Sequence, residues 1–76
     1  MTDLQRRLIM RYSFTPRQAQ VAELASRGLT NRAIADRLYV SEPAIKFHMT
    51  NIFKITRVAD RIKWIALVSR MNGHRI

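Results

Sequence analysis

The 76-residue chain contains no cysteine, which excludes a disulfide framework and any thiolate metal site. With two glycines and two prolines it also lacks a flexible linker and a glycine-rich phosphate-binding loop. Its two histidines, His48 and His74, are too few for a metal site, and no nucleophile–base pair or carboxylate cluster is present. We therefore expect one small domain that is not an enzyme and binds no metal or cofactor.

Long apolar runs are also missing. No stretch approaches the ~20 consecutive apolar residues that are needed to span a bilayer. The apolar residues near the N-terminus are interrupted by Arg6, Arg7 and Arg11, a pattern that excludes a signal peptide. Absence of cysteine fits a reducing compartment. We expect a cytoplasmic, nucleoid-associated protein with no membrane partner.

Acidic residues are scarce. Five Asp and Glu stand against fourteen Lys and Arg, which gives a net charge of +9 and a sequence pI near 11.6. Such a surface attracts polyanions, with nucleic acid as the first candidate and an anionic membrane as the second. Eleven of the fourteen cations are arginine, whose planar fork suits phosphates and base edges. The alternative is a domain that is basic without a polyanionic partner.

Local signals predict an all-α fold. Thr15, Pro16 and Gln18 form a helix start with a capping box, and Gly28 ends a helix of about residues 16–27. Residues 3–12 are either a short helix capped by Asp3 or a frayed basic arm, within an N-terminal segment of residues 1–13. Residues 72–76 are expected to form a loose tail.

Two helices with a tight turn follow between residues 30 and 56. Thr30 caps a short helix that ends near Leu38, and Tyr39-Val40 forms the turn. Ser41 caps a helix of about residues 42–56, in which Ile45, Met49, Ile52 and Phe53 form an apolar line. A further helix, capped by Asp60, runs to about Met71. The paired helices and their turn are typical of a helix-turn-helix, although the usual glycine of the turn is absent near Tyr39.

The residues in this frame carry a more specific pattern. It comprises Thr15-Pro16-Arg17, Val21, Leu24-Ala25, Gly28, Thr30-Asn31-Arg32, Ile34-Ala35, Leu38, Val40-Ser41, Ile45-Lys46, His48 and Asn51-Ile52. This pattern resembles the LuxR-type DNA-binding domain, also called the GerE or FixJ type, over residues 14–67. The resemblance implies a four-helix helix-turn-helix domain over residues 14–71, preceded by the N-terminal arm or extra short helix. It also implies dimeric binding to double-stranded DNA and regulation of transcription.

The resemblance assigns roles to individual positions. DNA base contacts fall on Lys46, Phe47 and Thr50, and DNA backbone contacts on Thr30, Asn31, Arg32, Ser41, His48, Asn51 and Lys54. The dimer interface candidates, all on the last helix, are Ile62, Trp64, Ile65, Val68 and Ser69. Each assignment has a structural alternative, such as a solvated lysine for Lys46 or a core position for Phe47.

Two departures from the family pattern concern the contact between the helix over residues 42–56 and the last helix. Thr56 stands at a buried leucine position, and Trp64 stands where the family usually has alanine. Trp64 either fills the volume that Thr56 leaves between two helices or lies outside as an anchor of the dimer contact. Arg57 stands in place of the glycine that would mark the end of the preceding helix, so the sequence leaves the last residue of that helix open.

The leading functional hypothesis is a sequence-specific transcription regulator. Only thirteen residues precede Phe14, so we expect a stand-alone regulator that is controlled by its abundance or by a regulatory partner protein. The alternative is a protein-interaction module that binds another regulator or RNA polymerase through the same fold, using the last helix or residues 4–9. A structural DNA-binding protein is a third possibility.

Overall fold

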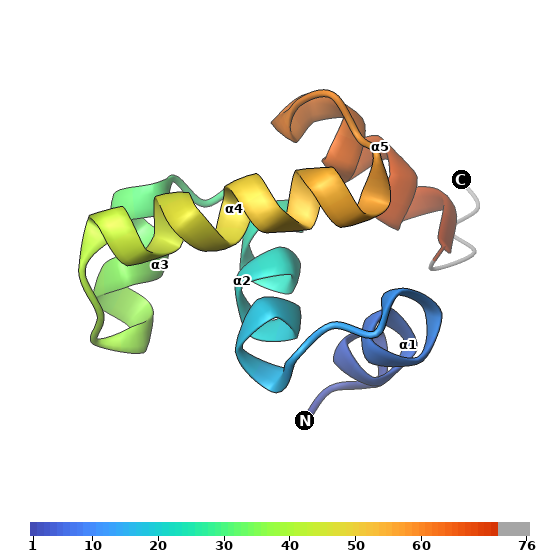
Figure 1. Cartoon of the computed structure of the whole chain (residues 1–76), viewed down its shortest axis with the longest axis horizontal. Helices are drawn as coiled ribbons and strands as arrows, with labels where there is room; N and C mark the ends of the chain where they lie inside the picture. The colour runs from blue at the N-terminus through green and yellow to red at the C-terminus, as the bar shows by residue number, and fades with distance from the viewer. Residues whose placement is uncertain (72–76) are drawn as a thin grey trace.

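The computed structural model describes residues 1–71, which form five α-helices and no strand within that range (Figure 1). The helices are α1 (Asp3–Tyr12), α2 (Pro16–Ser26), α3 (Asn31–Leu38), α4 (Glu42–Thr56) and α5 (Arg61–Met71). The all-α prediction is confirmed, and so are the bounds of the helix over residues 42–56. The expected tail, residues 72–76, lies outside the described residues.

The five helices begin where side chains can accept a hydrogen bond from their first turns. The caps, each accepting from the backbone amide three residues later, are Thr2, Thr15, Thr30, Ser41 and Asp60. At Thr15 the predicted capping box is complete, because Gln18 Oε1 accepts in return from the Thr15 amide. The prediction that Asp3 caps the first helix is wrong. Thr2 does so, and Asp3 places its charge in the first turn, where the helix dipole favours an anion.

Three helices end on residues other than glycine in the left-handed conformation. Ser13, Tyr39 and Arg57 have φ angles of 57°, 59° and 61°. Tyr39 therefore takes the conformation that the missing glycine of the helix-turn-helix would supply. Arg57 does the same after α4, so the loss of glycine there does not move the end of that helix from Thr56.

Helix α2 lies at the centre of the fold and packs against each of the other four helices. In Figure 1 it separates α1 from α4. Its buried apolar residues are Ala19, Val21, Ala22, Leu24 and Ala25. Three of these are alanines, whose small side chains let several helices approach one axis. The core therefore forms around α2.

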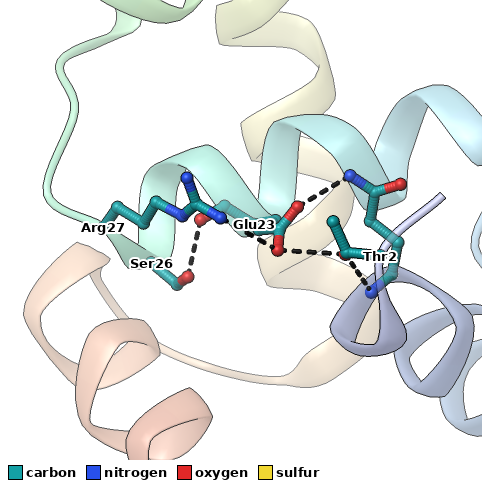
Figure 2. Close-up of polar contacts among 5 residues, drawn as sticks. Thr2, Glu23, Ser26 and Arg27 are labelled. Atoms are coloured by element: carbon teal, nitrogen blue, oxygen red, sulfur yellow. Dashed lines mark hydrogen bonds and ion pairs between the residues drawn. The ribbon is translucent and has the colours of Figure 1, made fainter.

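Residues 3–12 are a packed helix rather than a frayed arm. Leu4 and Leu8 of α1 are buried in the common core. A polar cluster around Glu23, the one buried charged residue among those described, joins α1 to α2 (Figure 2). Its carboxylate accepts from Thr2 Oγ1 at 3.0 Å, Gln5 Nε2 at 2.7 Å and Arg27 at 3.4 Å. The hydrogen bonds from the α1 segment and the ion pair with Arg27 together offset the cost of burying the Glu23 charge.

Trp64 of α5 belongs to the core of the single chain. Its side chain is 0% exposed, and its Nε1 donates a 2.8 Å hydrogen bond to the Ala22 carbonyl of α2. Its ring lies 6.5 Å from that of Tyr12, which stacks in turn on Phe14. Packing, not dimer contact, is therefore the role of Trp64. These contacts are with α1 and α2, so they lend no support to a volume exchange with Thr56, whose hydroxyl donates to the Ile52 carbonyl.

We expect Trp64→Ala to lower the free energy of unfolding by about 3–5 kcal/mol, because it empties a fully buried site and removes a buried hydrogen bond. Chemical denaturation at low protein concentration measures this loss. Ile62→Ala on the same helix is the control. Ile62 is 79% exposed, so its truncation should change the stability of the monomer by less than about 0.5 kcal/mol. Equal stabilities for the two variants would contradict the core role of Trp64.

Candidate nucleic-acid interface

Helices α3 and α4 form the helix-turn-helix, and their packing decides which side of α4 faces solvent. Ile34 and Ala35 of α3 are buried against the core, and Val40 of the turn packs on it. Ile45, Met49 and Ile52 are the buried residues of α4, with Phe53 packed beside them, as the apolar line predicts. The opposite side of α4 is consequently exposed to solvent.

That exposed side holds the predicted base-contact residues together. Lys46, Phe47 and Thr50 are all exposed, and they occupy the first half of α4. The Phe47 side chain is 66% exposed, which rules out a core position in the single chain. The Thr50 hydroxyl donates to the Lys46 carbonyl at 3.0 Å. In this conformation Thr50 presents its methyl group and the remaining lone pairs of its oxygen to a ligand.

Three other predicted contacts line the flanks of the same helix. Lys54 is exposed in the last turn, whereas His48 and Asn51 are half-buried. The His48 ring meets the Phe47 ring edge-on, with 6.1 Å between centroids. His48 and Asn51 thus lie at the margin of the exposed side of α4.

The N-termini of α3 and α4 carry the remaining predicted contacts. Thr30 and Ser41 accept from the amides of Ala33 and Ala44 at 3.1 and 3.2 Å. A hydroxyl that accepts in this way still has its own hydrogen to donate. The first amides of each helix and the dipole favour an anion at the same place. With exposed Arg32 beside Thr30, the start of α3 has the chemistry of a phosphate site.

Arg61, the first residue of α5, was not predicted from the sequence to belong to the interface. Its guanidinium donates to Asn31 Oδ1 at the start of α3. Another of its nitrogens, Nη1, is buried without a hydrogen-bond partner. This burial lowers the pKa of Arg61 from its usual range, although an arginine stays protonated at neutral pH. Nothing in the sequence distinguishes Arg61 from the ten other arginines, because its partner lies thirty residues away.

The predicted dimer residues divide between surface and core. Trp64 and Val68 are buried within the single chain, which corrects their assignment as contact surface. Ile62 and Ser69 are exposed and Ile65 is half-buried. Ile65, Val68 and Ser69 line a groove of about 380 Å³ between α5, α2 and α1. The surface open to a second subunit is therefore narrower than the five candidates suggest.

No group of three or more potential metal ligands occurs among residues 1–71. None of the helices in that range has the length and apolar character that crossing a membrane requires.

Comparison with known proteins agrees with this arrangement. Residues 12–68 match the model of the family described as bacterial regulatory proteins, luxR family. The chain belongs to the LuxR family. It is 41% identical to the HTH-type transcriptional regulator AlkS of Pseudomonas putida over 56 residues, which are 74% of this chain and 6% of AlkS. No solved structure matches the chain significantly.

Two further relatives have different overall lengths. Identity is 32% to the transcriptional regulatory protein ComA of Bacillus subtilis, over 78% of this chain and 27% of ComA. It is 33% to the nitrate/nitrite response regulator protein NarL of Escherichia coli, over 64% of this chain and 23% of NarL. This LuxR-type chain thus spans about a quarter or less of each of these relatives. It is a helix-turn-helix DNA-binding domain of transcription regulators, which is not a class of enzyme.

We expect Lys46→Ala to weaken binding to a preferred duplex by ~1–3 kcal/mol and to blunt the preference for that duplex over a scrambled one, if exposed Lys46 donates to base edges as predicted. Fluorescence anisotropy titrations with both duplexes, at several salt concentrations, measure the effect. Lys63→Ala removes another exposed lysine, on α5, and serves as the charge-matched control. If Lys46→Ala weakens binding equally on both duplexes, Lys46 contacts a phosphate rather than a base.

Proposed function

We propose that the protein is a sequence-specific regulator of transcription that binds double-stranded DNA as a homodimer, with α4 of each subunit in the major groove. The observation that carries this proposal is the exposed side of α4, where Lys46, Phe47 and Thr50 lie together in the first half of the helix that Ser41 caps. Its place of action would be the cytoplasm, at the nucleoid.

The chemistry of the exposed side suits this task. The major groove admits one α-helix, and its base edges offer acceptors to a lysine and methyl groups to an aromatic ring. Groups that can bind phosphates accompany the proposed base-contact residues Lys46, Phe47 and Thr50. These groups belong to Thr30, Arg32, Ser41 and Lys54. The net charge of +9 adds attraction that does not depend on sequence. Together these groups supply both base reading and backbone positioning.

The homodimer rests on the surface of α5. Ile62, at 79% exposure, is a large apolar side chain that does not pack on the core of residues 1–71. Ile65 and Ser69 lie on the same helix one and two turns further on. A symmetric contact through these residues would present two copies of α4 to one duplex, and would place two half-sites about one DNA turn apart.

Selection of bound duplexes from random sequence tests the proposal. We expect a dyad motif whose half-sites are centred roughly 10 base pairs apart. Ile62→Asp should abolish dimerisation, weaken binding to the dyad and leave the fold intact, since Ile62 has little packing to lose. Size-exclusion chromatography with light scattering gives the mass of each variant. No enriched sequence would exclude a sequence-specific regulator, and an enriched single half-site would exclude the dimer.

A second candidate function is binding to another regulator or to RNA polymerase, and a groove on α1 favours it. This groove, of about 410 Å³, is lined by Arg6, Arg7, Met10, Arg11 and Met71. Met10 is 84% exposed. In Figure 1, α1 and α4 lie on opposite sides of α2, so a ligand here would leave the DNA-facing side uncovered. Methionines flanked by arginines suit an acidic amphipathic helix of a partner protein.

A fluorescently labelled helical peptide of leucines and glutamates is the probe for this groove. We expect it to bind, and the matched peptide with lysines for glutamates not to bind, because the groove is cationic. Arg6→Glu combined with Arg11→Glu should abolish binding. Arg17→Glu combined with Arg37→Glu makes the same change of net charge at other exposed positions and should reduce binding far less. Equal loss in both double variants would show general charge attraction instead of a groove.

A further inference from the structure

The first residues of two helices meet beside the candidate phosphate site. Asn31 opens α3, directly after the cap residue Thr30, and Arg61 opens α5. The Arg61 guanidinium donates to Asn31 Oδ1. Both residues are half-buried, so each still reaches solvent on one side. The contact therefore joins the start of α5 to the start of α3.

The hydrogen-bond donors and acceptors of Arg61 and Asn31 determine how the Asn31 side-chain amide is oriented. A guanidinium carries five N–H donors and no acceptor, so only the oxygen of an asparagine amide can face it favourably. The amide is planar, and its nitrogen lies on the side opposite the oxygen. With Oδ1 held by Arg61, the two N–H donors of Asn31 Nδ2 point away from the guanidinium and are available to an acceptor.

Arg61 itself has little freedom to turn away. Its Nη1 atom is buried without a partner, so part of the guanidinium is already enclosed by protein. An exposed arginine would avoid that loss by extending into water. Asn31 is the only hydrogen-bond acceptor of the Arg61 side chain among the described residues. The pair is therefore held together before any ligand arrives, as a preorganised contact requires.

We propose that Arg61 is a positioning residue for DNA binding: it turns the amide of Asn31 so that Nδ2 donates to a phosphate oxygen at the N-terminus of α3. The phosphate would also meet the first amides of α3, the Thr30 hydroxyl and exposed Arg32. Arg61 contacts no phosphate in this scheme and acts only through Asn31. The inference rests on the proposed DNA-binding function.

Asn31→Asp separates the two hydrogen bonds of the amide. The carboxylate still accepts from Arg61, so the melting temperature should be unchanged or higher. It has no donor for the phosphate and repels it, so the Kd for the selected duplex should rise by more than about tenfold. Ser13→Asp adds the same charge at an exposed position at the end of α1 and is the control. If the two variants bind DNA equally, Asn31 donates to no phosphate and the proposal is wrong.

Arg61→Gln tests the positioning role. A glutamine offers both a donor and an acceptor, so it no longer selects one orientation of Asn31, and we expect the Kd to rise by about threefold to tenfold. Arg61→Lys keeps a donor-only side chain and should restore most of the affinity. Arg70→Gln removes one exposed arginine from the same helix and measures the general effect of charge. Circular dichroism at the titration temperature verifies that each variant is folded.

The decisive measurement combines variants. In an Asn31→Ala background, Arg61→Gln should weaken binding no more than Arg70→Gln does, because nothing remains for Arg61 to position. A further loss beyond that control would show direct phosphate contact by Arg61 and overturn the positioning role. Unchanged affinity for Arg61→Gln in the wild-type background, while Lys46→Ala still weakens binding, would overturn this inference alone. Failure of the wild-type protein to bind any duplex would overturn it together with the proposed function.

Discussion

The burial of α2 by all four other helices is the constraint on which the structure depends. A helix covered on several sides cannot carry large side chains everywhere, and α2 accordingly buries three alanines together with Val21 and Leu24. Helices α1 and α5 pack on α2, whereas α4 packs mainly on α2 and α3. The outer side of α4 is exposed to solvent, and Lys46, Phe47 and Thr50 on that side take no part in the buried core.

Sequence reasoning succeeds here where the determinants are local. Capping residues at Thr15, Thr30 and Ser41 and the apolar line of α4 lie within one or two helical turns of what they determine, so the helix bounds follow from them. Contacts between residues that are far apart in the sequence could not be predicted from these local signals. The bond from Trp64 spans 42 residues and that from Arg61 spans 30, and periodicity does not select partners over such separations. The packing of residues 3–12 stayed open for the same reason, since it depends on Glu23.

The three left-handed residues show how the chain manages with few glycines. A residue with a Cβ in this conformation costs ~1–2 kcal/mol relative to the right-handed one. Replacing glycine also restricts the unfolded chain, which offsets part of that cost. The hydrogen bonds of Ser13, Tyr39 and Arg57 to carbonyls of the last helical turn favour the folded geometry further. A pattern that expects glycine at such positions can therefore be satisfied by other residues, provided that the helix end is held by packing.

The ion pairs of the described residues lie away from the candidate interface, although Asp36, Glu42 and Asp60 are on or beside α3, α4 and α5. Among residues 1–71 the ion pairs are Arg7 with Asp3 and Arg27 with Glu23, all on α1 or the end of α2. Lys46 and Lys54 have no carboxylate within ion-pairing distance in that range, although Glu42 stands one turn before Lys46. A phosphate approaching α4 would therefore displace water and counterions rather than an internal carboxylate. The Glu23 carboxylate also accepts hydrogen bonds from Thr2 and Gln5 and thereby holds α1 against α2. Both ion pairs therefore lie on the side of α2 away from the proposed DNA contact.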